Sequence, residues 1–341
     1  MPPYAAASGG TDAEGVSHVQ TVLAHRVTRR VVEAVLTLLG VAVLVFVMLR
    51  VIPGNQITAT LGTEASAALT PGQQAALRAY YGLDQPPVVQ FFGWLGNVLG
   101  GNLGISQRTG QSVLDMTLAA LPVTIELAIL ATLFGLLLGV PLAMLSASRA
   151  NGARDAAGQL VGLAALSIPS FLLGAVLLAF VSKYFHYNPS AQGFARLLSD
   201  PGLNLQQMLF PSLVLGFGLA APIMRTGRSA LLEVQSQDFV RTARGKGVAP
   251  LRVQIRHVLH NALVPIVTMT GIQFGYLLGG AVVVEQIFSV PGIGRQVLIG
   301  LQQKEYAVVQ STVLVIALSF VLVNLLTDLL YRVIDPRVRA S

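Results

Sequence analysis

The hydrophobic residues of this chain fall into six long runs that polar segments separate. The six runs are Val31–Ile52, Leu121–Leu145, Leu160–Val181, Phe210–Leu231, Leu263–Ile287 and Val308–Tyr331. A helix needs roughly 20 apolar residues to cross a hydrocarbon core of about 30 Å, and each run meets that length. The pattern therefore predicts an all-α membrane protein with six transmembrane helices.

Composition supports this class and excludes several kinds of site. The chain is 53% hydrophobic and only 11% charged, whereas soluble domains carry about 25% charged residues. Because the sequence contains no cysteine, it has neither a disulfide framework nor a thiolate metal site.

The formal net charge of +7 reflects topology rather than nucleic-acid binding. In the six-span arrangement, 15 of the 22 lysines and arginines fall on one side of the membrane. Lysine and arginine are enriched in short cytoplasmic loops, so we expect a plasma-membrane protein with both termini in the cytoplasm and no nucleic-acid partner. These residues are Arg26, Arg29, Arg30, Arg149, Arg154, Arg225, Arg228, Arg241, Arg244, Lys246, Arg252, Arg256, Arg332, Arg337 and Arg339.

This topology predicts four regions. We expect residues 1–25, which are mostly small and polar, to be a disordered cytoplasmic extension. Residues 26–120 hold the first transmembrane helix and an external region, residues 121–333 form a five-helix core, and residues 334–341 are a cytoplasmic tail. The first run is too long for a cleaved signal peptide, so we expect it to remain as an anchor.

The stretch between the first two spans is the largest extramembrane piece. Thr70-Pro-Gly-Gln is a starter for a short helix that runs through Tyr81. The apolar stripe in residues 88–98 includes Phe91 and Trp94 and is expected to lie on the membrane surface or pack on the bundle. We therefore expect a small external subdomain.

Small residues recur at four-residue spacing within two of the spans. Gly135 and Gly139 do so in the second span, and Gly271, Gly275 and Gly279 in the fifth. Such spacing lets helix backbones approach closely in lipid, so we expect bundle packing here, with the lining of a translocation path as the lesser alternative.

Residues 233–262, between spans four and five, form a basic amphipathic segment. Proline is absent from Ala230 to Lys246, Gly247 interrupts the helical pattern, and Pro250 can start a second helix. In that second helix one face is predicted to be apolar and the other basic. The apolar face holds Leu251, Ile255, Val258, Leu259 and Ala262, and the basic face holds Arg252, Arg256, His257 and His260. Such a segment either lies on anionic lipid headgroups or binds a cytoplasmic partner.

The segment resembles the EAA loop of ABC-importer permeases, whose short coupling helix docks into a groove on the ATP-hydrolysing subunit. Gly247 takes the place of the family's glycine and Ala243 that of its second alanine. Thr242 takes the place of the first alanine, whereas Arg241 stands where glutamate is usual. The resemblance implies that the residues coupled to the ATPase subunit are Asp238, Arg241, Thr242, Ala243, Arg244, Lys246, Gly247 and Arg252.

Further motifs extend this resemblance from about residue 26 to the end of the chain. They are Tyr81-Gly-Leu-Asp-Gln-Pro86, Gly101-Asn-Leu-Gly-Ile-Ser106, Leu121-Pro-Val-Thr-Ile-Glu-Leu127, Val284-Glu-Gln-Ile-Phe-Ser-Val-Pro-Gly-Ile-Gly294 and Ile334-Asp-Pro-Arg337. Together they resemble the dipeptide, oligopeptide and nickel branch, and specifically the first-type permease of its heterodimeric pair. The resemblance implies the type I importer permease fold, alternating access and three kinds of protein partner. These are a second homologous permease, two ATPase subunits and an extracytoplasmic solute-binding protein, with membrane lipid around the bundle.

Motifs for catalysis and metal binding are absent. A P-loop needs two glycines and a hydroxyl at fixed spacing, but Val240 and Gly247 occupy two of those positions around Gly245-Lys246. Neither His-Glu-x-x-His nor Gly-x-Ser-x-Gly occurs, and His257 and His260 have no carboxylate near them in the sequence. We expect this chain to bind no cofactor or metal itself and not to be an enzyme, with ATP and magnesium on the partner subunits.

Three acidic residues fall within or near the spans and are candidates for the substrate pathway. They are Glu126, Glu285 and Asp328. Ionisable groups at membrane depth are costly and often functional, although an interfacial residue bonded to the bundle is the alternative for each. The cargo stays open among dipeptides, oligopeptides, nickel and glutathione.

Two other classes of function compete with an ATP-driven importer. An ATP-independent channel or carrier would use the basic segment to bind lipid, but the charged positions here cluster near the interfaces rather than the midplane. A purely structural scaffold explains neither the basic segment nor the external region. Co-purification of an ATPase would separate the importer from both.

Overall fold

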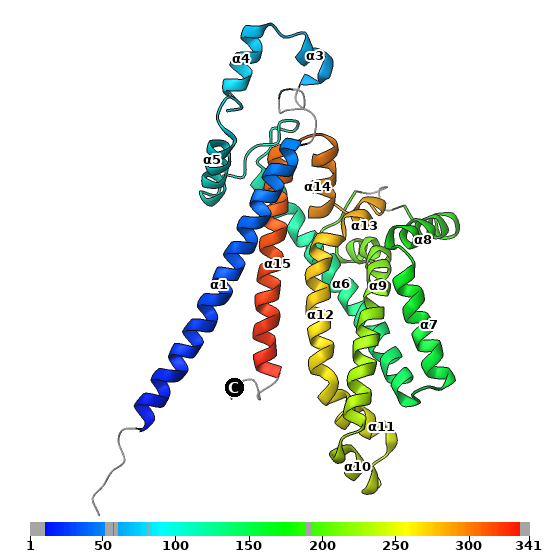
Figure 1. The fold of residues 1–341 in the computed structure, drawn as a ribbon. Helices are drawn as coiled ribbons and strands as arrows, with labels where there is room; N and C mark the ends of the chain where they lie inside the picture. The colour runs from blue at the N-terminus through cyan, green and yellow to red at the C-terminus, as the bar shows by residue number, and fades with distance from the viewer. Residues whose placement is uncertain (1–10, 52–56, 58–60, 81, 189–192, 335–341) are drawn as a thin grey trace, which may run out of the picture.

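The structure is a computed structural model that describes residues 11–51, 57, 61–80, 82–188 and 193–334. Side chains are described from Thr28 to Thr327, apart from residues 52–56, 58–60, 63, 80, 81 and 189–192. Long helices run side by side in an elongated bundle, with short helices at both ends (Figure 1). The described part of the chain contains no strand, only an isolated bridge between Ile105 and Ser112. The all-α fold class is confirmed.

The helices follow one another along the chain without any sheet between them. Their bounds are α1 (Thr11–Val51), α3 (Thr63–Ala67), α4 (Pro71–Tyr80), α5 (Pro87–Leu99), α6 (Val113–Ser148), α7 (Ala153–Ser167), α8 (Ser170–Phe185), α9 (Pro201–Gln235), α10 (Asp238–Gly245), α11 (Pro250–Arg252), a π-helix (Val253–Leu259), α12 (His260–Gly280), α13 (Val282–Ile287), α14 (Ile293–Gln302) and α15 (Tyr306–Ile334). α1 extends back to Thr11, so residues 11–25, predicted to be disordered, are helical. Alanine, glutamate, glutamine and leucine in this stretch favour a helix continuous with the span. Residues 1–10 and 335–341 lie outside the described residues.

Five helices in the described part of the chain are long and apolar enough to cross a membrane, and a bent pair brings the number to six. The bent pair is α7 and α8, which meet at 93°. The prediction of one straight span over 160–181 is therefore wrong. Pro169 is the reason, because a proline disfavours the helical conformation of the residue before it, and Ile168 has an extended ψ of 116°.

The fifth span also differs from its prediction. The helix that starts at Pro250 ends at Gly280, and the predicted last turns form the separate helix α13. Gly279 and Gly280 stand at the break, and glycine is a poor helix former. Within the same helix, residues 253–259 adopt π-helical hydrogen bonding.

The core of the bundle is the contact between α6 and α9, the most extensive in the molecule. A Cβ at Gly139 would lie 2.8 Å from the carbonyl oxygen of Ala220, and one at Gly135 would lie 2.8 Å from Leu219 Cβ. Neither position has room for a side chain. The small residues at four-residue spacing therefore serve close packing, as predicted.

The glycine ladder of the fifth span packs α12 against α15. A Cβ at Gly271 would overlap Thr327, and one at Gly275 would lie 3.0 Å from the Phe320 ring. Two helix pairs, α6–α9 and α12–α15, thus use the same device.

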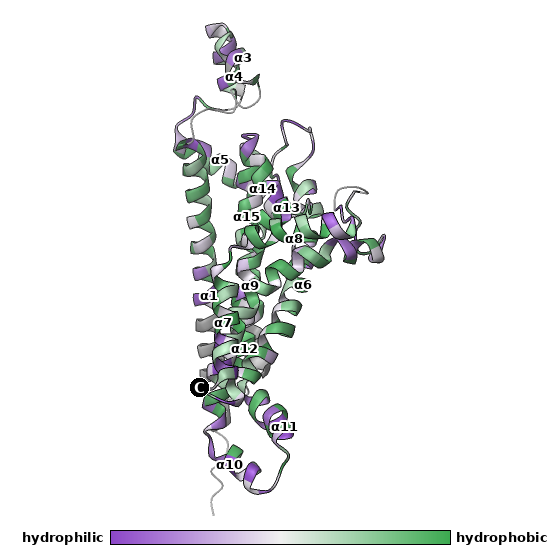
Figure 2. Cartoon of the chain, turned by 90° about the vertical axis from the view of Figure 1, so that its right-hand side faces the viewer, coloured by the Kyte–Doolittle hydropathy of each residue, from purple (hydrophilic) through white to green (hydrophobic). Residues whose placement is uncertain are grey.

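Polar residues gather at the two ends of the bundle. Hydrophilic colour is concentrated at α3 and α4 on one end and at α10 and α11 on the other, while the long helices are mostly hydrophobic (Figure 2). α4 starts as the sequence predicts, because Gln73 N donates to Thr70 Oγ1 at 3.3 Å and Thr70 N donates back to Gln73 Oε1 at 3.0 Å.

Candidate functional site

The segment from α10 to the π-helix protrudes from the bundle at the end opposite α3–α5 (Figures 1 and 2). α9 stops at Gln235, where Ser236 Oγ donates to the Glu233 carbonyl at 2.7 Å. The chain then turns, and α10 begins with Asp238 in its first turn. The sequence pattern predicted helix throughout this region and did not reveal the break at Ser236, because serine bonding to its own backbone is a local alternative to helix.

Gly247 ends α10 in a Schellman motif. Its N–H donates to the Arg244 carbonyl at 3.0 Å, and the Val248 N–H donates to the Ala243 carbonyl at 3.3 Å. This pattern requires a left-handed residue after the helix, and Gly247 has φ of 73°. A residue with a Cβ is strained there. The predicted glycine turn is confirmed.

The two apolar residues on the inner face of α10 anchor it to the bundle. Val240 is fully buried and Ala243 is 9% exposed. Both belong to a buried cluster that includes Leu231 of α9 and Val253 and Val258 of the π-helix. α10 is therefore held as a fixed element rather than a loose loop.

The remaining predicted coupling residues point away from this cluster. Their side chains, or the backbone at the glycine, are exposed at Asp238, Arg241, Thr242, Arg244, Lys246, Gly247 and Arg252. Thr242 Oγ1 donates to the Asp238 carbonyl at 2.9 Å, and Arg241 Nη1 lies 3.5 Å from Asp238 Oδ1. The outer face of α10 thus offers mainly cationic groups to a partner.

The π-helix redistributes the apolar residues that the sequence placed on one face. Val258 is fully buried, but Leu251 is 69% exposed and Ile255 is 50% exposed. The apolar face predicted over residues 251–262 is therefore only partly buried. Hydrogen bonds to the fifth residue along, instead of the fourth, rotate the helix register. Val253 is buried instead of Leu251 and Ile255.

A buried ion pair near the same end of the bundle was missed by sequence reasoning. Arg228 of α9 contacts Asp155 of α7 through two hydrogen bonds, of 2.7 and 2.6 Å. Ser146 Oγ, at the end of α6, donates to the same carboxylate at 2.5 Å. Three helices thus meet at one carboxylate whose side chain is 1% exposed. Its only sequence signal was a pair of opposite charges near the ends of two apolar runs.

Glu285 lies in a fully buried site at the other end. Its carboxylate accepts from Thr124 Oγ1 at 2.6 Å and from the Arg295 N–H at 2.8 Å. Burial raises the pKa of the Glu285 carboxyl, and these hydrogen bonds act in the opposite direction. Gly292, beside it, has no room for a Cβ. The arrangement ties α6 and α13 to the first turn of α14.

The other two acidic candidates have different surroundings. Glu126 of α6 is half-buried, and Asn204 Nδ2 of α9 donates to its Oε2 at 3.4 Å. Among the described residues, Glu126 Oε1 is a buried atom without a hydrogen-bond partner. Asp328 belongs to α15, but its side chain lies outside the described residues.

Two cavities open near the α3–α5 end. One, of about 710 Å³, lies between α1, α5 and α15, and the other, of about 660 Å³, lies between the start of α6 and α14. Neither Glu126 nor Glu285 is among the residues that line them. The two acidic candidates whose side chains are described therefore lie outside both cavities.

Two protein families match this chain, each over a different part of its length. Residues 139–340 match the binding-protein-dependent transport system inner membrane component. Residues 23–128 match the N-terminal region of binding-protein-dependent transport system membrane components.

Named relatives match this chain over nearly its whole length. The probable peptide ABC transporter permease protein y4tP of Sinorhizobium fredii is 35% identical over 92% of this chain and 98% of its own length. The glutathione transport system permease protein GsiC of Salmonella typhimurium is 36% identical over the same shares. A putative peptide permease protein of Brucella suis is 38% identical over 89% of this chain and 95% of its own length.

A solved structure supports the fold. The MetNI methionine ABC transporter in inward facing conformations aligns with a TM-score of 0.50 and 20% identity, over 64% of this chain and 96% of the matched chain. The likeness concerns the fold alone and agrees with the predicted importer permease fold.

These matches extend along the chain and include the protruding segment between α9 and α12. The family is the membrane component of its transporters, so ATP hydrolysis belongs to partner subunits, and a binding protein is the further partner. The chain is a multi-pass inner-membrane protein that belongs to the family of binding-protein-dependent transport system inner membrane components, the permease subunits of ATP-driven ABC importers.

Proposed function

We propose that this permease imports peptides and forms half of a translocation pathway that a second homologous permease completes. Two ATPase subunits drive it, and their closure on ATP moves the pathway between outward-open and inward-open states. Support for the peptide cargo comes from relatives named as peptide permeases and as a glutathione permease. Glutathione is itself a small peptide.

The observation that carries the proposal is the shape of the α10–α12 connection. Its inner face is buried in the bundle through Val240 and Ala243, while its outer face is cationic. The same segment also exposes three apolar residues. Phe239 is 41% exposed, Leu251 is 69% exposed and Ile255 is 50% exposed. Exposed apolar residues rimmed by charge are typical of protein docking surfaces rather than of a purely lipid-bound helix.

The same segment is suited to transmit motion. α10 packs on the end of α9, and the helix after the Gly247 turn continues into α12. A partner that pushes on Arg244 or Leu251 therefore moves two spans of the core directly. We infer that the exposed predicted coupling residues form the ATPase contact and that Ala243 and Gly247 set its shape.

Orientation follows from the same contact and from the distribution of cations. The ATPase subunits work in the cytoplasm, so the α10–α11 end and both termini are cytoplasmic. The α3–α5 end is then the outer face, where a solute-binding protein docks near residues 55–120 and 289–306. ATP and magnesium bind to the ATPase subunits, this chain holds no cofactor or metal, and membrane lipid surrounds the bundle.

Co-purification tests the docking surface without requiring a known cargo. Leu251→Asp places a charge on exposed surface, so the fold should persist while the co-expressed ATPase is lost from the complex. Leu198→Asp is the matched control, because Leu198 is 98% exposed at the opposite end of the bundle. Full retention of the ATPase by Leu251→Asp would contradict the proposed contact.

A further inference from the structure

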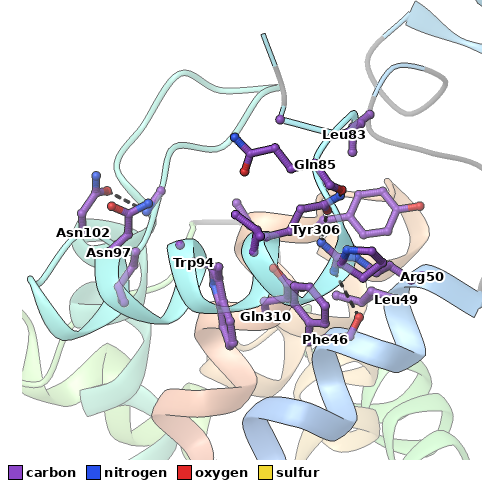
Figure 3. Close-up of a pocket in the computed structure, with 18 of the residues that line it drawn as sticks. Phe46, Leu49, Arg50, Leu83, Gln85, Trp94, Asn97, Asn102, Tyr306 and Gln310 are labelled. Atoms are coloured by element: carbon purple, nitrogen blue, oxygen red, sulfur yellow. Dashed lines mark hydrogen bonds between the residues drawn. The ribbon is translucent and has the colours of Figure 1, made fainter. Parts of the chain in front are cut away.

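The larger of the two cavities near the α3–α5 end lies where α1 meets α5 and the start of α15. Figure 3 shows Arg50 of α1, Trp94 of α5 and Tyr306 of α15 around it. Its volume of about 710 Å³ is enough for a polar headgroup or a small solute. The proposed ATPase contact lies at the opposite end of the bundle and does not involve this cavity, which opens beside the surface where the solute-binding protein is proposed to dock.

The lining of the cavity carries positive charge without a carboxylate. Arg50 and Arg78 are among the lining residues, and no aspartate or glutamate is among those that the structure describes. Asp84, in the turn between α4 and α5, is exposed and does not line the cavity. The cavity therefore favours an anion.

The Arg50 guanidinium is held in place by neutral groups. Its Nη2 donates to Gln90 Oε1 at 2.6 Å, and its Nη1 donates to the Phe46 carbonyl at 3.2 Å. The guanidinium carbon also lies 3.3 Å from the centre of the Phe46 ring. These contacts orient the side chain but leave its charge without a counterion among the lining residues.

The rim of the cavity is apolar where it faces the membrane. Val51, next to Arg50, is 76% exposed, and Val88 and Val89 of α5 are 65% and 50% exposed. α1 packs mainly against α15 and α5, so most of its circumference faces lipid. A fixed cation at the end of an apolar span, with apolar side chains beside it, is the environment of a lipid headgroup and its acyl chains.

Trp94 lines the cavity and is the residue type that is typical of a membrane–water interface. Its ring stacks near Phe46 with centroids 6.2 Å apart. Among the described residues its buried Nε1 has no hydrogen-bond partner. Tryptophan is enriched at membrane–water interfaces because one end of the ring is apolar and the other is polar.

We propose that this cavity binds the phosphate headgroup of an anionic phospholipid, with the acyl chains lying along the exposed apolar faces of α1 and α5. Arg50 is the principal phosphate contact and Arg78 a second one. A docked acidic protein segment would also meet the charge, but it would not account for the apolar rim at the end of a membrane span. The site rests on the proposed function only for naming this face the outer one.

Trp94 makes the test direct, because it is the single tryptophan in the sequence. The full chain in a zwitterionic detergent is titrated with short-chain phosphatidylglycerol, and the Trp94 emission is recorded. Matched short-chain phosphatidylcholine, inorganic phosphate and a soluble acidic peptide form the other three arms. We expect a saturable change with phosphatidylglycerol and no comparable change with any of these three.

Three variants locate the response. Arg50→Gln should weaken the apparent affinity for phosphatidylglycerol by about tenfold or more, the scale of one charge-assisted hydrogen bond. Arg78→Gln, at an exposed position in α4, should weaken it without disturbing the packing of α1. Arg108→Gln removes one positive charge from the lining of the second cavity and should leave the affinity for phosphatidylglycerol unchanged. Helix content by circular dichroism confirms that each variant is folded.

Several outcomes would overturn the lipid site. These are equal responses to phosphatidylglycerol and phosphatidylcholine, a response to inorganic phosphate as strong as that to the lipid, or unchanged affinity in folded Arg50→Gln and Arg78→Gln. A response to an acidic peptide but not to phosphatidylglycerol would assign the cavity to a protein instead. No arm requires ATP, cargo or an ATPase, so failure here leaves the proposed transport function standing.

Discussion

At the scale of single residues, the backbone conformation of one glycine sets the geometry of the docking segment. Gly247 and Gly245 are two residues apart, and a Cβ added at either meets nothing within 4 Å. They differ in conformation, because only Gly247 has a positive φ, of 73°. A difference between alanine variants at these two positions would therefore report backbone strain at Gly247, because steric crowding is absent at both.

Replacing these glycines by alanine should have opposite consequences. Gly247→Ala should destabilise the turn by about 1–2 kcal/mol, the cost of a left-handed residue with a Cβ. Gly245→Ala, in the last turn of α10, should be neutral or stabilising by up to about 1 kcal/mol. Hydrogen exchange of α10 in the assembled complex measures the local difference, and equal protection in the two variants would contradict this account of the turn.

Glu126 is the acidic residue most suited to meet cargo. Its Oε1 lacks a partner among the described residues, whereas Glu285 is fully bonded. If Glu126 attracts peptide amino groups, Glu126→Gln should reduce uptake of cationic peptides more than that of neutral peptides. Competition between the two peptide classes in one vesicle preparation measures this, and an equal loss for both would indicate a structural role instead.

At the scale of elements, the approach of α6 to α9 fixes the core. Gly139 faces the Ala220 carbonyl and Ile223, with no room for a methyl group. Gly218, which belongs to α9, has open space at its Cβ position. The two glycines lie on the two helices of one pair, and only Gly139 has atoms of the other helix where its Cβ would stand.

Alanine at these positions should act on stability in different directions. Gly139→Ala should destabilise the bundle by about 1–3 kcal/mol through overpacking. Gly218→Ala should be neutral or stabilising, because alanine is the better helix former. Thermal unfolding in one detergent compares them, and a Gly139→Ala midpoint at or above the wild-type value would rule out close packing as the reason for this glycine.

Element types could be predicted from the sequence, but their internal breaks could not. Four of the six apolar runs, the Thr70 cap and the Gly247 turn are local signals that lie where the pattern placed them. The bend at Pro169 had a local signal in the proline itself. The π-helix had none, because its register depends on burying Val253 and Val258 against α9 and α10.

The glycine turn and the exposed cations of the proposed docking segment could be predicted because these residues are consecutive, whereas contacts between distant helices could not. Asp155 and Arg228 are 73 positions apart, and Thr124 and Glu285 are 161 apart. Only the packing of α6, α7, α9 and α13 brings these pairs together. Sequence reasoning therefore named Glu285 as a pathway candidate without the contacts of its carboxylate to Thr124 and to the first turn of α14.

At the scale of the whole molecule, an apolar bundle joins two polar ends that do different work. The α10–α11 end carries the exposed cationic and apolar residues of the proposed docking surface. Two cavities open near the α3–α5 end. α9 and α12 run the length of the bundle from the docking segment, so movement there reaches the opposite end. The central claim is that ATP-driven movement of this segment opens and closes the pathway.

Uptake of a labelled peptide library into vesicles that contain this chain and its co-expressed partners tests that claim most directly. It is measured with and without ATP, for the wild type and for Gly247→Val, after confirming that the complex assembles. The account predicts uptake that requires ATP and is lost in the assembled variant. Uptake that persists without ATP, or a variant that transports as well as the wild type, would contradict it.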